Sequence, residues 1–287
     1  MGSNKNPLIS VITSCYKSNP AYLRESLLSI LNQTYGEFEL LVSNNGVDFN
    51  LKDFITSFKD DRIKCIDNGG NIGPTASYDN LAHLAKGEYV AIQDHDDISL
   101  PHRLQEEKDV LESNLAIMSV SGVIHIFGGK REYDDGETMQ PSRVREELLF
   151  WQPIKQPTFM KRKSLCKWYK YDPNYMIYDF EYWSRIRKEP HFICNSVLLK
   201  YRKSNLNTGN GRTKKIREEH AKIVRRNLAT LGINAPIELC KALDPYDHHI
   251  FDKSILDVFV ANREKLLKHI SPKLYNRKLQ ELEHKTI

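Results

Sequence analysis

The stretch YVAIQDHDDISLP, residues 89–101, joins a short apolar run to three carboxylates within four positions. Its first four residues, YVAI, predict a buried strand, because they are uncharged and rich in β-branched side chains. Asp94, Asp96 and Asp97 follow where this strand is expected to end. Like charges at this spacing repel one another, so the strand end needs a counter-charge. The elements before this stretch indicate where these carboxylates lie in the fold.

Strand and helix patterns alternate over the first hundred residues. Apolar runs at residues 9–13, 38–42 and 62–66 predict three more strands. Asn19-Pro20 predicts the start of a helix. The segment 74–86 predicts another helix, which we expect to end at Gly87. Strands that alternate with helices favour an α/β fold with a mostly parallel central sheet flanked by helices.

Polar residues follow each of the four predicted strands. In parallel sheets, ligands bind outside the carboxyl ends of the strands. Turn-forming residues at one strand end are ordinary. Polar residues at four ends on the same edge favour a polar ligand crevice, formed by residues 14–16, 43–46, 67–71 and 93–97.

The carboxylates at residues 94–97 match the ligand preference of a hard divalent cation. Mg²⁺ is usually held by one or two carboxylates together with substrate phosphates, and Mn²⁺ prefers the same oxygen ligands. Asp94 and Asp96 therefore predict a metal that bridges a diphosphate. A solvated turn rich in aspartate is the alternative for such a short motif.

The second half of the chain is less regular. We expect a helix at residues 104–114, a strand at 118–127 and a mobile loop at 132–145. In the tail, one helical stripe runs from Ile216 to Leu231 before Gly232. A second stripe runs from Ile255 to Ile270, and we expect Ser254 to cap it.

The charge balance separates the tail from the rest of the chain. The formal net charge is +5, and residues 206–287 hold 16 Lys and Arg against 10 Asp and Glu. The preceding 205 residues are nearly neutral, so the positive surplus lies in the tail. Five scattered cysteines without a paired motif predict reduced thiols and a cytoplasmic location. The longest apolar run, residues 115–127, is too short to cross a bilayer.

Several segments together resemble the family-two glycosyltransferases, which are inverting and use nucleotide sugars. The matching segments are LISVITSCYKSNPAYLRESLLSILNQTY, FELLVSNNG, GGNIGPTASYDNLAHLAKGEYVAIQDHDD, LPHRL, QPTFMKRKSL, YDFEYWSRI and YRKSN. The resemblance implies a GT-A fold, with a Rossmann-like nucleotide-binding half and a C-terminal helical extension. It predicts a catalytic domain at residues 1–205, divided into a nucleotide-sugar half (1–100) and an acceptor half (101–205), and a basic helical region at 206–287.

The resemblance also implies roles for individual residues. Asp179 matches the general base, and Asp94 and Asp96 match the carboxylates that bind Mg²⁺ or Mn²⁺ with the diphosphate. Contacts to the nucleotide and diphosphate are assigned to Thr13, Ser14, Tyr16, Asn44, Asn71, Asp94 and Arg202. The donor is expected to be a UDP-sugar, and the transferred group a hexose or N-acetylhexosamine. The acceptor is expected to be a glycan or a lipid-linked glycan of the cell envelope.

Three positions depart from the family pattern. Asn44 stands where relatives have an Asp that reads the base, Tyr78 where many have Arg, and Tyr178 where Glu is usual. An amide both donates and accepts hydrogen bonds, whereas a carboxylate only accepts them. The identity of the base therefore stays open on the sequence alone.

Two basic segments support an alternative of a different class. Residues 155–170 carry six basic side chains with interleaved aromatic residues and no acid, and residues 212–226 form a second basic cluster. Such segments are typical of proteins that bind nucleic acid or an anionic surface. The near-neutral first 205 residues argue against nucleic acid. We therefore expect peripheral contact with an anionic membrane, and the sequence predicts no oligomeric state.

Overall fold

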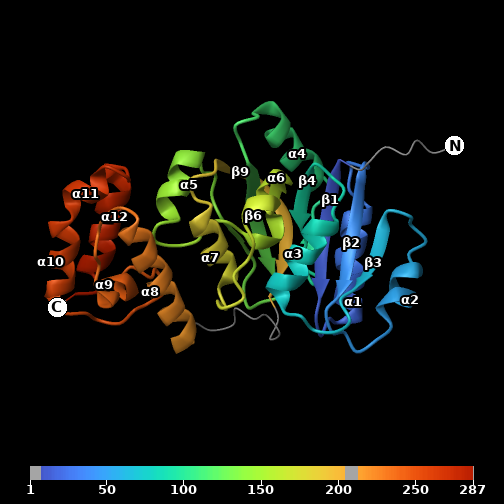
Figure 1. Ribbon diagram of the computed structural model, residues 1–287, viewed down its shortest axis with the longest axis horizontal. Helices are drawn as coiled ribbons and strands as arrows, with labels where there is room; N and C mark the ends of the chain where they lie inside the picture. The colour runs from blue at the N-terminus through green and yellow to red at the C-terminus, as the bar shows by residue number, and fades with distance from the viewer. Residues whose placement is uncertain (1–7, 204–212, 287) are drawn as a thin grey trace. The chain divides into compact units, whose positions relative to one another are not determined.

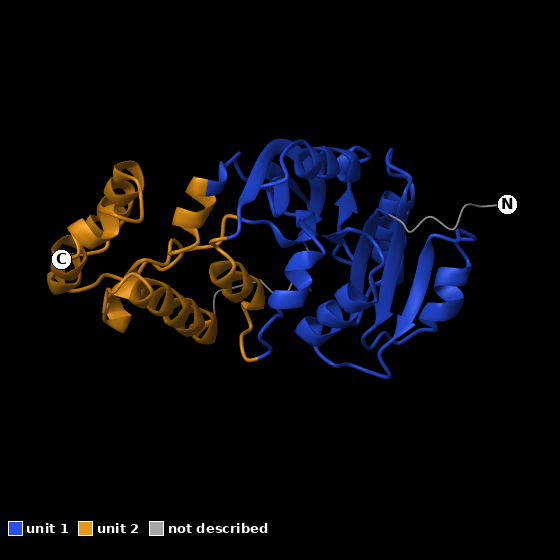
Figure 2. Cartoon of the chain, turned by 45° about the horizontal axis from the view of Figure 1, so that its top comes forward, with its two compact units in different colours: residues 1–141, 154–173, 189–205 blue, residues 142–153, 174–188, 206–287 orange. Residues whose placement is uncertain are grey.

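The computed structural model describes residues 8–203 and 213–286, and Figure 1 draws their helices and strands, coloured from blue at the N-terminus to red at the C-terminus. The chain divides into two compact units, which Figure 2 colours separately. Unit 1 comprises residues 1–141, 154–173 and 189–205. Unit 2 comprises residues 142–153, 174–188 and 206–287. Unit 2 thus combines the tail with two segments from the middle of the chain, and the predicted domain limit at residue 205 stays a prediction.

Within the described residues, unit 1 is built on one mixed sheet of nine strands. The strands are β1 (Ile9–Cys15), β2 (Phe38–Asn44), β3 (Ile63–Asp67), β4 (Tyr89–Ile92), β5 (Ile98–Ser99), β6 (Ser119–Phe127), β7 (Tyr133–Asp135), β8 (Met160–Arg162) and β9 (His191–Arg202). They lie in the order β3-β2-β1-β4-β8-β6-β9-β5, and β7 pairs with β6.

The first four strands confirm the predicted parallel half. β2 pairs with β3, and β1 lies between β2 and β4, with all of these pairs parallel. β8 then runs antiparallel to both β4 and β6. The carboxyl ends of β1 to β4 therefore share one edge of the sheet, as the polar strand ends predicted.

The helices and one short 3₁₀ segment of unit 1 lie between these strands in sequence. They are α1 (Pro20–Leu31), α2 (Leu51–Thr56), α3 (Pro74–Leu84), α4 (Arg103–Ser113), η1 (Gln156–Thr158) and α6 (Ser164–Trp168). Asn19 caps α1, because its side chain accepts hydrogen bonds from the Ala21 and Tyr22 N–H groups. Leu23, Leu27 and Ile30 recur at helical spacing on α1 and are fully buried in the main core. Each such burial contributes about 1.5–3 kcal/mol.

Unit 2 is helical in its described residues. Its helices are α5 (Pro141–Glu147), α7 (Tyr178–Arg185), α8 (Lys214–Ala229), α9 (Ile237–Ala242), α10 (Lys253–Ala261), α11 (Arg263–Leu267) and α12 (Pro272–Glu283), with the first residue of α5 in unit 1. A second core joins α8 to α12 with Leu149, Phe150 and Phe180. The segments at 142–153 and 174–188 thus pack with the tail because they share its hydrophobic core.

Two predicted helix boundaries were wrong. α3 ends at Leu84, and Gly87 is not its terminator. A Cβ at Gly87 would lie 2.6 Å from the Ser10 nitrogen, so glycine is required there by the close approach of strand β1. The tail stripe is capped by Asp252, whose side chain accepts from the Ser254 N–H.

The tail stripe at 255–270 and the segment 132–145 also differ from expectation. The stripe is broken at Asn262 into α10 and α11, because periodicity does not report where a helix bends. The segment predicted as a loop contains β7 and most of α5. Residues 133–135 form a strand because they pair with β6, and the polar sequence of the segment does not predict this pairing.

Candidate active site

The acidic loop, residues 94–97, leaves the carboxyl end of β4. The Tyr78 hydroxyl donates to Asp94 Oδ1, with 2.8 Å between the two oxygens. Asp97 is fully buried, and burial raises its pKa well above its usual range. The neighbouring carboxylates of Asp94 and Asp96 raise it further. The loop is thus a place where negative charge is concentrated and one carboxyl group is shielded from water.

A buried polar network supports this loop from beneath. Gln93 Nε2 donates to the Asp94 and Asp97 carbonyl oxygens at 3.1 and 2.9 Å. Arg103 Nη1 in turn donates to Gln93 Oε1 at 2.9 Å, and Arg103 pairs with Glu107. Burial raises the pKa of Glu107 to about 7, although Arg103 opposes that shift. The sequence did not single out Gln93 or Glu107, because burial of charged side chains is set by tertiary packing.

The acidic loop offers a divalent cation only part of its ligands. No group of three or more His, Cys, Asp or Glu side chains in the described ranges is arranged to hold a metal ion. Two carboxylates, Asp94 and Asp96, fit a Mg²⁺ or Mn²⁺ ion that takes its other ligands from a diphosphate and water. Such an ion would offset the negative charge that Asp94 and Asp96 concentrate at this strand end.

The last residues of β1 and β2 are joined through helix α3. The Ser14 and Ser43 hydroxyls each lie 2.8 Å from the hydroxyl of Ser77, which is buried on α3. Thr13 is also buried, and its Oγ1 has no hydrogen-bond partner among the described residues. Tyr16 is 42% exposed, and its ring lies against Gly46. Of the predicted nucleotide contacts at 13–16, Ser14 is thus joined to β2 through Ser77, which the sequence did not indicate.

Asn44 lies at the end of β2, and its side-chain carbonyl is occupied. Asn44 Oδ1 accepts from the Gly46 and Val47 N–H groups, at 3.2 and 3.3 Å. Two N–H donors facing one atom identify it as the oxygen, so the amide N–H groups of Asn44 are the ones left for another partner. Asn71 is held similarly, since its Oδ1 accepts from the Gly73 N–H at 2.9 Å.

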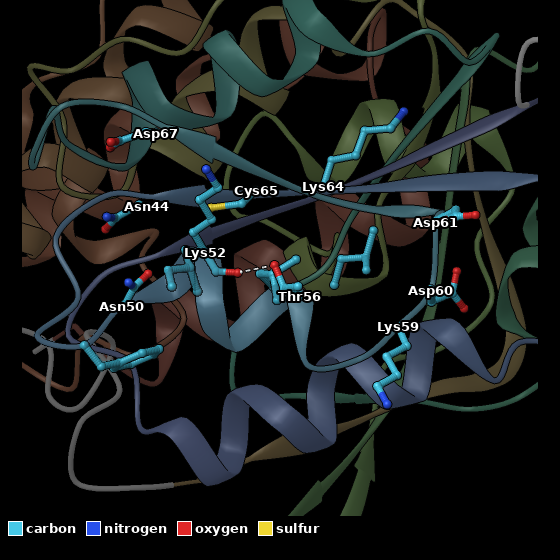
Figure 3. Close-up of a pocket in the computed structure, with 14 residues that line it drawn as sticks. Asn44, Asn50, Lys52, Thr56, Lys59, Asp60, Asp61, Lys64, Cys65 and Asp67 are labelled. Carbon is cyan, nitrogen blue, oxygen red and sulfur yellow. Dashed lines mark hydrogen bonds between the residues drawn. The ribbon is translucent and has the colours of Figure 1, made fainter.

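A pocket of about 940 Å³ lies beside the edge strand β3 and helix α2. Figure 3 shows Asn44 and Asp67 near each other at one side of this pocket. Its remaining lining comes from residues 49–52, 55–56, 59–61 and 63–65. Neither Asp94 nor Asp96 lines the pocket. It therefore adjoins the predicted nucleotide site only through Asn44 and Asp67.

Arg202 ends strand β9 and contacts the acidic loop. Its backbone N–H donates to Asp97 Oδ1 at 2.8 Å, and its Nε donates to the Asp96 carbonyl oxygen at 2.9 Å. Its guanidinium also pairs with Glu25. Eight of the predicted site residues therefore lie in unit 1, where Arg202 contacts the loop that carries the two metal-binding candidates.

Asp179 lies in unit 2, in the first turn of α7. Gln152 Nε2 donates to Asp179 Oδ2 at 2.9 Å, and the Phe180 N–H donates to Asp179 Oδ1 at 2.8 Å. Glu219 of α8 accepts from the Met176 N–H at 2.7 Å, just before α7 begins. The tail thus anchors the segment that carries Asp179, a support that sequence spacing could not indicate.

The two basic segments differ in how far their side chains are used inside the fold. Lys161 is buried, Lys155 pairs with Asp135, and Lys163 donates to the Ala85 carbonyl oxygen. Arg226 of α8 pairs with the buried Glu181. Some cations of the first segment are therefore used inside the fold, whereas Lys214, Lys215, Lys222 and Arg225 of the second segment are exposed. Residue 212 of the second segment lies outside the described residues.

No helix in the described residues has the length and apolar character that crossing a membrane requires.

Comparison with family models matches residues 10–187 to "Glycosyl transferase family 2". An uncharacterised glycosyltransferase of Methanocaldococcus jannaschii is 30% identical, over 75% of this chain and 77% of that protein. An O-antigen biosynthesis glycosyltransferase of Escherichia coli, WbnJ, is 29% identical, over 70% of this chain and 82% of that protein.

Solved structures share the fold at low sequence identity. S. aureus TarS, residues 1–349 in complex with UDP-GlcNAc, aligns with a TM-score of 0.65 at 16% identity, over 96% of this chain and 87% of that one. The mannosyltransferase PcManGT from Pyrobaculum calidifontis, in complex with GDP-Man and Mn²⁺, aligns with a TM-score of 0.59 at 14% identity, over 98% and 86%. These alignments confirm the predicted α/β architecture with its C-terminal helices as the GT-A type.

Proposed function

The chain belongs to glycosyl transferase family 2, and on that premise we propose an inverting transfer from a nucleoside diphosphate sugar to a hydroxyl group of a glycan or lipid-linked acceptor. The observation that carries this proposal is the acidic loop at the carboxyl end of β4, where a parallel sheet binds its ligands. Asp94 and Asp96 are the residues that would hold Mg²⁺ or Mn²⁺ there.

Inversion requires a base and a stabilised leaving group. Asp179 is the proposed base, and its carboxylate accepts the proton of the acceptor hydroxyl as that oxygen attacks the anomeric carbon. Gln152 supports this assignment, because its N–H donates to one oxygen of Asp179 and so orients the carboxylate. A bound Mg²⁺ or Mn²⁺ ion would offset the negative charge that develops on the departing diphosphate.

The donor and acceptor classes follow from the relatives. A UDP-sugar carrying a hexose or N-acetylhexosamine is the proposed donor, supported by the TarS complex with UDP-GlcNAc. The role of the Escherichia coli relative WbnJ in O-antigen biosynthesis supports a cell-envelope polysaccharide as the product. We place the reaction in the cytoplasm, with peripheral contact at the cytoplasmic face of the membrane.

The membrane contact has a specific candidate surface on α6. Trp168 is 80% exposed and is flanked in sequence by the exposed Lys167 and by Lys170. An exposed indole beside ammonium groups suits the interface of an anionic bilayer. Flotation with anionic and neutral vesicles tests this contact, and Trp168→Ala should reduce recovery with the anionic vesicles. Equal recovery of the wild type with both vesicle types would contradict it.

A donor screen tests the proposed reaction. Purified protein is incubated with UDP-, GDP-, CDP- and dTDP-sugars, and released nucleotide is measured with Mn²⁺, with Mg²⁺ and with EDTA. We expect release from one donor class, dependent on a divalent ion and enhanced by an acceptor glycan. Release that is equally fast in EDTA would overturn the metal assignment. Absence of release and of any nucleotide-induced thermal shift would overturn the proposed donor.

A further inference from the structure

We propose that Arg202 is a positioning residue, which fixes the backbone of the acidic loop so that Asp94 and Asp96 are held for a metal ion. Family resemblance implied a direct approach of Arg202 to the diphosphate. The contacts of its guanidinium favour a role through the loop instead. The effect of Arg202 on metal binding rests on the proposed function. The effect of Arg202 on the acidic loop can be measured without any ligand.

The backbone of Arg202 holds one end of the loop. Its N–H donates to Asp97 Oδ1 at 2.8 Å, where Asp97 is fully buried. Donors stabilise a buried carboxyl group, and this N–H is the donor to Asp97 Oδ1, whereas Asp97 Oδ2 has no hydrogen-bond partner among the described residues. The last residues of β9 therefore fix the side chain that follows the two metal-binding candidates.

The side chain of Arg202 holds the same loop by a second route. Its Nε donates to the Asp96 carbonyl oxygen at 2.9 Å. Its guanidinium carbon lies 4.1 Å from the centre of the Tyr22 ring and 4.7 Å from that of the Phe127 ring. Glu25 of α1 pairs with a terminal nitrogen of the same group.

These contacts restrict the orientation of the guanidinium. Aromatic rings attract its faces, and the carboxylate of Glu25 and the Asp96 carbonyl engage its edge. Only 13% of the Arg202 side chain is exposed, whereas 52% of the Glu25 side chain is. Two aromatic rings and two acceptors therefore hold the guanidinium of Arg202 in place. Through its hydrogen bond to the Asp96 carbonyl oxygen, the guanidinium in turn holds the backbone of the acidic loop.

The acidic loop needs hydrogen bonds that hold its backbone, because repulsion between its carboxylates destabilises its conformation. We call the hydrogen bonds from Arg202 the clamp. Three carboxylates lie within four residues, and their repulsion favours a spread backbone. Gln93 holds the Asp94 and Asp97 carbonyl oxygens from the β4 side. Arg202 holds Asp96 and Asp97 from the β9 side. With both sides held, a metal ion finds its two carboxylates already oriented and pays less ordering entropy.

Hydrogen–deuterium exchange of the ligand-free protein tests the clamp directly. Arg202→Lys keeps the charge but loses the planar group that stacks between rings and donates from Nε. We expect the backbone amides of residues 94–98 to exchange about tenfold faster in this variant, and by a smaller factor in the milder Glu25→Gln. Unchanged exchange in Arg202→Lys would overturn the proposal.

Arg24→Lys is the matched control. Arg24 lies on α1 and, like Arg202, lies near two rings, with its guanidinium carbon 5.1 Å from the centre of the Phe54 ring and 4.9 Å from that of the Phe58 ring. Within the described residues, no hydrogen bond or ion pair joins Arg24 to the acidic loop, and its guanidinium donates to the Ser57 hydroxyl. We expect residues 94–98 to exchange at the wild-type rate in this control. Faster exchange in both variants would indicate general loosening and overturn a specific clamp.

Nucleotide binding separates a positioning role from direct diphosphate binding. The probe is UDP, measured by calorimetry in EDTA and across a Mn²⁺ titration. We expect Arg202→Lys to raise the half-saturating Mn²⁺ concentration about tenfold and to leave the metal-free affinity for UDP unchanged. Loss of the metal-free affinity with normal amide exchange would assign Arg202 to the diphosphate instead. If the wild type binds none of the nucleotides in the donor screen, the proposed function fails, and the exchange result still decides the clamp.

Discussion

The Tyr78 hydroxyl donates a hydrogen bond to the carboxylate of Asp94, with 2.8 Å between Tyr78 Oη and Asp94 Oδ1. Tyr78 lies on α3 and is 5% exposed, so this bond forms largely out of contact with water. Many relatives are expected to carry Arg at this position, and here a neutral hydroxyl orients the first carboxylate of the acidic loop. A hydrogen bond to a charged group contributes about 1.5–3 kcal/mol.

Tyr78→Phe removes this donor and leaves the ring in place. We expect the half-saturating Mn²⁺ concentration for nucleotide binding to rise about tenfold, because Asp94 loses the bond that orients it. Tyr35→Phe is the control, since Tyr35 is half-buried in unit 1 and its ring faces Lys108. A similar rise in both variants, or in neither, would contradict the role of Tyr78.

Asp179→Asn tests the proposed base. The amide keeps the shape of the side chain but cannot accept the proton of the acceptor hydroxyl, so transfer should fall by about 10²–10⁴-fold. Donor binding, measured by calorimetry, should stay within about twofold of the wild type. Asp257→Asn, on an exposed position of α10, should leave transfer unchanged. Normal transfer by Asp179→Asn would exclude Asp179 as the base.

Asn44→Asp tests which atom of residue 44, at the end of β2, faces the nucleobase of the donor. In the wild type the carbonyl oxygen is held by the Gly46 and Val47 N–H groups, so an amide N–H faces any further partner. The aspartate keeps one oxygen on those groups and offers the other as an acceptor. Uracil has a donor at N3 where cytosine has an acceptor, so the ratio of UDP to CDP affinity should rise about tenfold. An unchanged ratio of the two affinities would show that residue 44 does not contact the nucleobase.

Gly87→Ala tests the close approach between the α3–β4 connection and β1. The new Cβ would lie 2.6 Å from the Ser10 nitrogen and 2.8 Å from the Ile9 carbonyl carbon, and neither backbone atom can move aside cheaply. We expect a loss of about 2 kcal/mol or more, read from the urea midpoint. Gly36→Ala is the control, because its Cβ would meet nothing within 4 Å. That variant should stay within about 0.5 kcal/mol of the wild type.

His191 gives the protein a specific loss of stability in acid. The ring lies between the Ser119 and Ser121 hydroxyls, and burial lowers its pKa from 6.5 to about 3. The unfolded chain therefore binds a proton that the folded chain refuses between pH 6.5 and 3. Stability from this group is complete above pH 6.5 and is lost as the pH falls towards 3, by about 1.4 kcal/mol per pH unit.

His191→Gln should remove that part of the pH dependence. Urea unfolding between pH 7 and pH 4 measures the slope, which should be shallower in the variant even if its stability at pH 7 is lower. His83→Gln changes an exposed histidine of α3 and should keep the wild-type slope. Parallel slopes for the wild type and His191→Gln would show that His191 is not the group responsible.

The parallel half of the fold could be predicted because its signals are local. The predicted apolar runs of four or five residues lie in β1 to β4, and Asn19 caps α1 as its sequence indicates. The role of Gly87 could not be predicted, because it depends on the backbone of Ser10, which is 77 residues away. The regular structure in the segment 132–145 was not predicted for the same reason, since β7 depends on pairing with β6.

The sequence by itself determined the α/β class, the polar edge at the strand ends and the family, because these depend on the spacing of residue types along the chain. The tertiary structure decided how each site residue is held. It brings Tyr78 within hydrogen-bond distance of Asp94, Arg202 within that distance of the acidic loop, and Gln152 within that distance of Asp179. These contacts join residues 16 to 106 positions apart. The physical reason is that hydrogen bonds and burial depend on distance in space, which local sequence patterns do not encode.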